Sequence, residues 1–220
     1  MATVARPTLL LTRPYADSQR FAAMLPEWRA IISPILEIVP VAHDVDVVRS
    51  AQGLVFTSGH AIASAGAGRG RLAICVGPRT GQLARRAGFK VVEGNGFAES
   101  LLPLIAAAEI PLLHPHGRHL ARELPVKNVV VYDQLPLALT GAARDLLAVT
   151  DPVVVPLFSP RSARILGQQV SHAQAPLWPV AISRAAMDAW NAPAVARNIA
   201  SEPSSRAMAA AIRQLPVREH

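Results

Sequence analysis

The stretch that decides the fold is "GLVFTSGHAIAS", residues 53–64. An apolar run stops at Thr57-Ser58-Gly59, and a helix-compatible run of small residues follows at once. In parallel α/β sheets ligands bind where strands end, because the first N–H groups of the next helix point outward there. The stretch therefore predicts a buried strand whose exit binds an anion, without saying which anion.

Strand and helix patterns alternate along the rest of the chain. Short apolar runs typical of buried strands lie at 8–14, 51–58, 71–78, 89–94, 110–117, 151–160, 177–183 and 194–201. Runs compatible with helices lie at 15–25, 59–68, 79–88, 97–109, 118–125, 141–150, 161–173, 184–193 and 202–215. Strands that alternate with helices build parallel sheets. The predicted fold class is therefore α/β with doubly wound parallel sheets.

The two parts of the chain also resemble each other. The similar segments, in the same order, are 55–64 and 156–166, 73–88 and 180–194, and 94–105 and 201–212. Such an internal repeat favours two similar domains over one continuous sheet. The other interpretation, that any two α/β halves look alike, stays open.

Composition narrows the classes of partner. Hydrophobic residues make up 51% and charged residues 17%, which suits a packed core rather than a disordered chain. Lys and Arg number 22 against 15 Asp and Glu, giving a net charge of +7 that suits an anionic partner. Scattered basic residues and few aromatics argue against nucleic acid. No run predicts a membrane span or a signal peptide, so we expect a cytoplasmic protein that binds neither membrane nor nucleic acid.

The side chains offer few alternatives to anion binding. Cys75 lies inside the apolar run "RLAICVG" and is expected to be a buried core residue rather than a nucleophile. His114, His116 and His119 are close in sequence, but the ligands that would complete a metal site are missing, so we expect partly exposed loop histidines near an anion and no metal. Carboxylates are few and scattered, which leaves paired-carboxylate chemistry without an anchor.

Four strand exits are the main candidates for a site. Each combines small or hydroxyl residues with a helix start: Thr12-Arg13-Pro14, Thr57-Ser58-Gly59, Gly77-Pro78-Arg79-Thr80 and Ser159-Pro160-Arg161. Such residues are either helix caps or anion-binding groups, and both interpretations stay open. These patterns leave the reaction open.

The order of the motifs resembles the uroporphyrinogen-III synthase family over nearly the whole chain. The motifs are "LLLTRP", "GLVFTSGHAI", "AICVGPRTGQLARRAGFKVV", "GNGFAESL", "HPHGRHLAREL", "VVVYDQLPL", "VVPLFSPRSARIL" and "SEPSSRAMAAAI". The resemblance implies two domains joined by a two-stranded linker, with the second domain inserted into the first. The first domain is then expected at 1–36 and 138–220, the second at 42–131, and the linker strands at 37–41 and 132–137.

The resemblance also implies a reaction. The family cyclises the linear tetrapyrrole hydroxymethylbilane, inverts its ring D and releases water, as a lyase without metal or organic cofactor. A substrate with eight carboxylates agrees with the basic balance. Tyr132 matches the family's linker tyrosine and is expected to face the cleft and assist the leaving hydroxyl; its alternative role is packing. Substrate binding is expected at Thr12, Arg13, Thr57, Ser58, Gly59, Gly77, Thr80, His116, Gly117, Ser159, Pro160, Arg161 and Ser183.

The chain departs from the family pattern at "ISRAAM", residues 182–187. Ser183 stands where relatives carry Gly, and the following threonines are absent. The rival hypothesis is therefore a non-catalytic α/β module that binds an anionic, tetrapyrrole-like ligand. For the enzyme we expect a monomer whose only partners are the substrate and, transiently, the preceding enzyme of tetrapyrrole biosynthesis.

Overall fold

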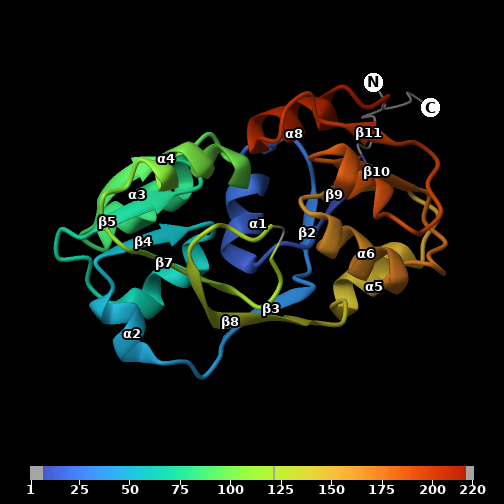
Figure 1. Ribbon diagram of the computed structural model, residues 1–220. Helices are drawn as coiled ribbons and strands as arrows, with labels where there is room; N and C mark the ends of the chain where they lie inside the picture. The colour runs from blue at the N-terminus through green and yellow to red at the C-terminus, as the bar shows by residue number, and fades with distance from the viewer. Residues whose placement is uncertain (1–6, 121, 217–220) are drawn as a thin grey trace. The chain divides into compact units, whose positions relative to one another are not determined.

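The computed structural model describes residues 7–120 and 122–216, and the chain divides into two compact units. Unit 1 comprises Met1–Glu37 and Pro136–His220, and unit 2 comprises Ile38–Leu135. In the part described, each unit has its own sheet, with mostly parallel pairings (Figure 1). The predicted α/β fold class is confirmed. The expected first domain includes residues 1–6 and 217–220, which lie outside the described residues.

Unit 1 contains a sheet of order β11-β10-β9-β1-β2 among the described residues, and all its pairings are parallel. Its strands are β1 (Thr8–Leu11), β2 (Ala30–Ile32), β9 (Val153–Leu157), β10 (Leu177–Ala181) and β11 (Asn198–Ile199). The central strand β9 is buried along its whole length, as its "VVVPL" sequence requires. Because all these pairings are parallel, the carboxyl ends of the strands lie at one edge of the sheet.

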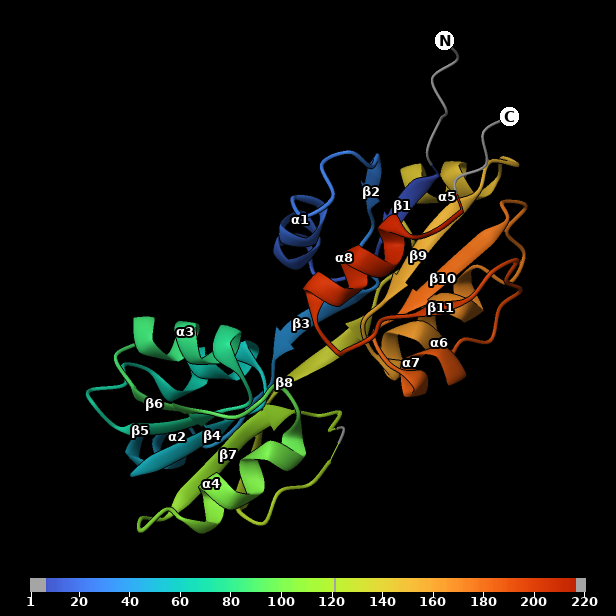
Figure 2. The ribbon, with the colours of Figure 1, turned by 90° about the horizontal axis from the view of Figure 1, so that it is seen from above.

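Helices cover both faces of this sheet (Figure 2). One apolar cluster packs α5 (Gly141–Leu147), α6 (Pro160–Gln169) and α7 (Arg184–Asp188) against the sheet. The other packs α1 (Tyr15–Ala22) and α8 (Ser205–Arg213). A doubly wound layer of this kind leaves the carboxyl edge as the place for a ligand.

Hydroxyl side chains begin four helices of unit 1. Thr140, Ser159, Ser183 and Ser204 each accept a hydrogen bond from the backbone N–H three residues later, at 3.1–3.3 Å. These bonds satisfy helix-start donors that would otherwise lack a partner. The sequence thus fixes where α5, α6, α7 and α8 begin.

Unit 2 contains a sheet of order β3-β8-β7-β4-β5-β6 among the described residues. Its strands are β3 (Leu36–Pro40), β4 (Gly53–Phe56), β5 (Leu72–Cys75), β6 (Lys90–Glu93), β7 (Leu112–Gly117) and β8 (Lys127–Pro136). The pairings from β8 through β7, β4 and β5 to β6 are parallel, with an irregularity between His116 and Gly117. The expected linker segments 37–41 and 132–137 thus overlap β3 and β8, except at Val41 and Leu137.

Short helices cover unit 2. Its helices are α2 (Val45–Ser50), α3 (Pro78–Arg86), α4 (Leu102–Ala106) and the 3-10 helices η1 (Gly59–Ala65) and η2 (Ala98–Leu101). One apolar cluster contains residues of α2, η1 and α3, and another contains residues of η2 and α4. Cys75 is fully buried in the first cluster, as predicted. Burial, and secondarily the charge of Glu93, raises the pKa of its thiol to about 12.

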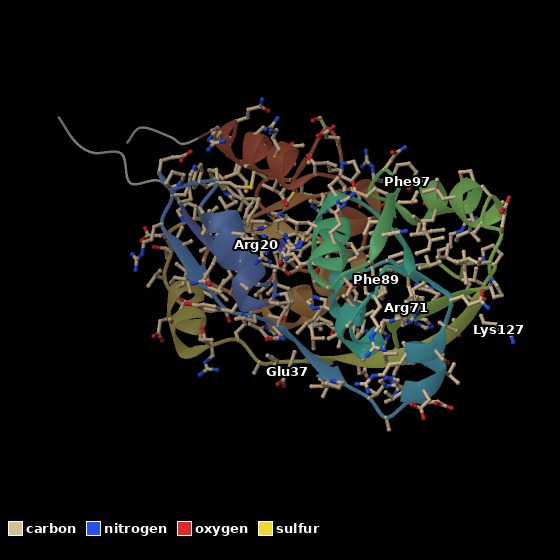
Figure 3. All side chains as sticks on the ribbon, turned by 90° about the vertical axis from the view of Figure 1, so that its left-hand side faces the viewer. Arg20, Glu37, Arg71, Phe89, Phe97 and Lys127 are labelled. Carbon is tan, nitrogen blue, oxygen red and sulfur yellow. The ribbon has the colours of Figure 1, made fainter. Side chains whose placement is uncertain are left out.

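Arg71 holds together the loops at the amino end of β5. Its guanidinium donates to the carbonyl oxygens of Gly68, Val48, Arg49, Ala51, Ala65 and Ala67, at 2.7–3.4 Å. The same group lies 5.2 Å from the ring centroid of Phe89, as a cation–π contact (Figure 3). A single guanidinium thus satisfies carbonyls in the last turn of α2, at the end of η1 and in the loops that follow them.

The helix predicted at 118–125 is wrong for the described residues of that segment, and Ala121 lies outside them. Only its first residue extends the pairing of β7 with β8, because the N–H of Arg118 donates to the carbonyl of Tyr132 at 2.9 Å, and the other described residues of the segment are irregular. The Arg118 and Arg122 side chains pair with Asp133 and Glu99. A helix this short has little stability by itself. The contacts with residues outside the segment therefore determine its conformation.

No described helix combines the length and the apolar character that crossing a membrane requires.

Candidate functional site

The carboxyl edge of unit 1 carries the strand exits predicted from the sequence. Thr12 and Arg13 follow β1, Ser159 follows β9 and Ser183 follows β10. These three strands are adjacent and parallel, so the exits lie along one edge. From β1 the chain continues into β2, which pairs with one side of β1, whereas β9 pairs with the other side of β1. The edge between β1 and β9 is thus the topological switch point where α/β sheets bind ligands.

Arg13 is held at this edge by its neighbours. Its guanidinium carbon lies 4.4 Å from the ring centroid of Phe158, the residue that follows β9. One of its guanidinium nitrogens lies 3.8 Å from a carboxylate oxygen of Asp17 in α1. The hydroxyl of Ser18 donates to the Arg13 carbonyl at 2.9 Å. A cation fixed between two strand exits contributes positive potential where an anion would approach.

Ser159 and Pro160 form the start of α6. The Ser159 hydroxyl contacts the Ser162 hydroxyl at 2.8 Å in addition to capping the Ser162 N–H. Pro160 occupies the first turn, where a missing N–H costs no helical bond. Arg161 follows in the same turn. The hydroxyl of Ser159 is thus engaged as a cap, which leaves backbone amides as the groups suited to a ligand.

Unit 2 has a matching switch point between β4 and β7. The chain runs from β4 to β5 on one side, and β7 pairs with β4 on the other. Thr57 and Ser58 follow β4, and β7 ends at His116 and Gly117. The Ser58 hydroxyl accepts from the N–H of His60 at 3.3 Å, which makes it the cap of η1. The structure therefore brings Thr57, Ser58, His116 and Gly117 to one edge.

Thr57 is joined to His114 across this edge. The Thr57 hydroxyl lies 3.0 Å from Nε2 of His114, which is 1% exposed. Burial, and then the nearby His116, lowers the pKa of His114 to about 4. His114 is therefore neutral at pH 7 and holds Thr57 through an uncharged hydrogen bond.

The prediction that the histidines are partly exposed loop residues is wrong for two of the three. His114 and His116 lie on β7 and are buried, with ring centroids 4.9 Å apart. Alternation along a strand places both on one face, which explains their burial. His119 follows the strand and lies 3.5 Å from Asp133. Within the described residues, no group of three or more His, Cys, Asp or Glu is arranged to hold a metal ion.

Tyr132 is buried rather than open to solvent. It is 6% exposed and belongs to the apolar cluster of β4, η1 and α3. Its ring lies edge-on to His60, 5.9 Å between centroids. It also covers Gly117, where an added Cβ would lie 2.4 Å from Cε2 of the tyrosine. Tyr132 thus packs directly against the backbone at the end of β7, and its expected position facing a cleft stays a prediction.

The remaining exit of unit 2 follows β5. Gly77 is the N-cap residue of α3, and its backbone is extended. Thr80, in the first turn of α3, is buried. A Cβ on Gly77 would lie 3.2 Å from Cα of Gly96, so two backbone segments approach closely there. A Cβ on Gly59 would lie 2.5 Å from Cδ1 of Leu83. Both glycines thus have a packing reason besides any ligand.

His114 and His60 were not among the predicted site residues. His114 contacts Thr57, and His60 contacts Tyr132. The alternation in "HPHG" could have shown that two histidines share a face of one strand. Nothing local in the sequence places His60 beside Tyr132.

The fold and these edges define a class: a two-unit α/β protein with helix-start amides and hydroxyl groups at a switch point in each unit, suited to anionic ligands. The model of the family "Uroporphyrinogen-III synthase HemD" matches residues 27–210. The chain belongs to the uroporphyrinogen-III synthase family, which confirms the resemblance. The predicted function, synthesis of uroporphyrinogen III in tetrapyrrole biosynthesis, is supported, and the non-catalytic alternative is not favoured.

Two solved structures are similar to the chain, and the first has the same fold. A uroporphyrinogen-III synthetase from Helicobacter pylori 26695 is 14% identical, with a TM-score of 0.61 over 92% of this chain and 96% of that one. A mutant uroporphyrinogen III synthase from Thermus thermophilus is 15% identical, with a TM-score of 0.48 over 94% and 98%. No curated protein matches the chain.

Proposed function

We propose that the chain is a lyase that converts hydroxymethylbilane into uroporphyrinogen III. The C–O bond of the terminal hydroxymethyl group breaks, and hydroxide leaves with a proton as water. The methylene carbon that remains bonds to the substituted α-carbon of ring D and gives a spiro intermediate. The bond from that α-carbon to its original bridging carbon then breaks, and the bridging carbon bonds to the free α-carbon of ring D. The proton lost from this second carbon balances the released water, and the macrocycle closes with ring D inverted. Nothing is oxidised or reduced overall, so the reaction needs no redox cofactor; the proposal assigns no metal or organic cofactor.

The observation that carries the proposal is the repeated switch point. In each unit, hydroxyl-capped or glycine-started helices follow adjacent parallel strands. Helix-start N–H groups and the positive end of the helix dipole favour carboxylates. A substrate with eight carboxylates and a chain with a net charge of +7 are complementary.

We assign carboxylate binding chiefly to backbone groups. In unit 2 these are the amides at Ser58, Gly59 and Gly77, with Thr57 as a hydroxyl contact and Thr80 in the turn that follows. In unit 1 they are the residues after β1 and β9, with Arg13 supplying charge. The assigned residues there are Thr12, Arg13, Ser159, Pro160 and Arg161. Binding many carboxylates at once would hold the flexible substrate folded, which lowers the entropic cost of closing the ring.

Ser183 fits the same role despite its departure from the family pattern. Its hydroxyl accepts from the N–H of Ala186 at 3.3 Å and so caps α7. The amides of that first turn remain suited to a carboxylate without the missing threonines. The departure at Ser183 is therefore compatible with the proposal.

We assign acid assistance to Tyr132. A phenol is a neutral donor at neutral pH, so it can hydrogen-bond to the departing hydroxyl without a prior change of charge. Gly117 and His60 fix the ring from two sides. The packing of the ring and a role for its hydroxyl are therefore compatible.

The location and partners are further parts of the proposal. We propose that the protein is a cytoplasmic monomer and that it binds the preceding pathway enzyme only transiently. These assignments rest on the sequence analysis.

The proposal is tested by supplying the purified protein with freshly prepared hydroxymethylbilane. The expected result is consumption of the substrate well above its spontaneous rate, unaffected by a metal chelator. Tight binding without faster consumption would favour the non-catalytic module. Consumption that stops with chelator and returns with added zinc would contradict a metal-free reaction.

A further inference from the structure

His116 presents a buried nitrogen without a partner at the carboxyl edge of unit 2. The residue is 5% exposed, and its Nε2 has no hydrogen-bond partner among the described residues. Leaving a buried polar atom unpaired costs roughly 1–3 kcal/mol. A ligand group that bonds to this atom would recover part of that cost.

The hydrogen bond of Nδ1 determines whether Nε2 of His116 can donate or accept a hydrogen bond. Nδ1 of His116 lies 2.7 Å from the carbonyl oxygen of Gly117. A carbonyl oxygen only accepts hydrogen bonds, so Nδ1 carries the proton. In the neutral ring Nε2 then has a lone pair and acts as an acceptor. Its natural partner is therefore a donor.

The side chains around His116 already have other contacts. His114, its neighbour on the same face of β7, already contacts the Thr57 hydroxyl. Alternation places Leu112 on this face, and Leu112 packs with the cluster of η2 and α4. Leu113 and Tyr132 belong to the cluster on the opposite face. His116 and Tyr132 thus flank the end of β7 from two sides.

We propose that Nε2 of His116 accepts a hydrogen bond from a pyrrole N–H of the ligand and does not contact a carboxylate. The inference rests on the proposed function, because it is the tetrapyrrole that supplies such donors. An ionised carboxylate carries no proton and so cannot donate a hydrogen bond to this lone pair. Four pyrrole N–H groups offer the donor that this atom lacks. His116 would therefore recognise the rings, while the strand-exit amides recognise the side chains.

The test compares two ligands and two substitutions. Uroporphyrinogen III, handled without oxygen, carries pyrrole N–H groups and carboxylates, whereas benzenehexacarboxylate carries only carboxylates. His116→Leu removes the acceptor, and His116→Gln restores an oxygen near the Nε2 position. The exposed His172→Leu serves as the control. We expect His116→Leu to weaken uroporphyrinogen III binding roughly threefold to tenfold, the equivalent of one neutral hydrogen bond. Benzenehexacarboxylate binding should be unchanged, and His116→Gln should recover most of the loss.

Two results would overturn the inference: unchanged affinity for both ligands in His116→Leu, or an equal loss for both. If that variant does not fold, ¹⁵N NMR of histidine in the wild-type protein decides the matter. We expect Nδ1 protonated, and an Nε2 resonance that moves on adding uroporphyrinogen III but not benzenehexacarboxylate; an unmoved resonance overturns the inference. A wild-type protein that turns over hydroxymethylbilane while His116→Leu binds normally refutes this inference alone. A wild-type protein that neither turns over the substrate nor binds the product refutes the proposed function as well.

Discussion

Acid should destabilise unit 2 through His114. Burial lowers the pKa of this side chain to about 4, whereas a histidine in an unfolded chain titrates near 6.5. Between these values the unfolded chain binds a proton that the folded unit does not. The free energy of unfolding therefore falls as the pH drops from about 6.5 to about 4, and His114 contributes no further loss below that.

The size of the effect follows from the two pKa values. Their difference corresponds to about 3 kcal/mol, a large part of the stability of a small domain. His114→Gln removes the titrating group and can still offer an amide to Thr57. The variant should therefore lose about 3 kcal/mol less than the wild type on acidification, and His172→Gln, an exposed control in unit 1, should behave like the wild type.

The assay has to report on unit 2 separately. All three tryptophans, Trp28, Trp178 and Trp190, lie in unit 1, so their fluorescence follows that unit. Hydrogen exchange of amides in β4 and β7, measured by mass spectrometry across the pH range, follows unit 2. Equal acid losses of protection in the wild type and in His114→Gln would refute the reasoning.

Other substitutions separate packing, capping and chemistry. Tyr132→Phe should slow turnover roughly ten- to a thousandfold with a normal thermal melt, because the ring remains and only the donor is lost; unchanged turnover would reduce Tyr132 to a packing residue. Gly117→Ala should lower both the melting temperature and turnover, because its Cβ would lie 2.4 Å from Cε2 of Tyr132; a normal melt would contradict that contact. Arg71→Met should cost about 3 kcal/mol or more in chemical unfolding, because several carbonyls lose their donor, while the exposed Arg86→Met should cost little. Ser58→Ala should cost only about 1 kcal/mol of stability and little affinity, because the amides remain; a severe loss of turnover would point to chemistry at its hydroxyl.

The strand exits could be predicted from the sequence because their signals are local. Ser159 and Ser183 directly follow apolar runs, Ser58 follows one after Thr57, and each serine caps the helix that starts there. The parallel order of the strands then brings these exits to the sheet edges. Neighbouring residues alone were enough to predict where these strands end and the helices begin.

The contacts across the edge could not be predicted in the same way. Thr57 and His114 are 57 residues apart, and their contact depends on β7 lying beside β4. Tyr132 pairs with Gly117 just after an irregularity in the register of β7 and β8, and no local sequence pattern predicts that irregularity. The segment 118–125 was predicted as a helix for the same reason, since its partners, Asp133 and Glu99, lie outside it.

The central claim is tested most directly by the isomer that the protein makes. Purified protein is incubated with hydroxymethylbilane without oxygen, the products are oxidised to porphyrins, and the isomers are separated by chromatography. The account predicts that isomer III, with ring D inverted, dominates at a rate that depends on protein concentration. Formation of only the uninverted isomer, at the spontaneous rate, would contradict it.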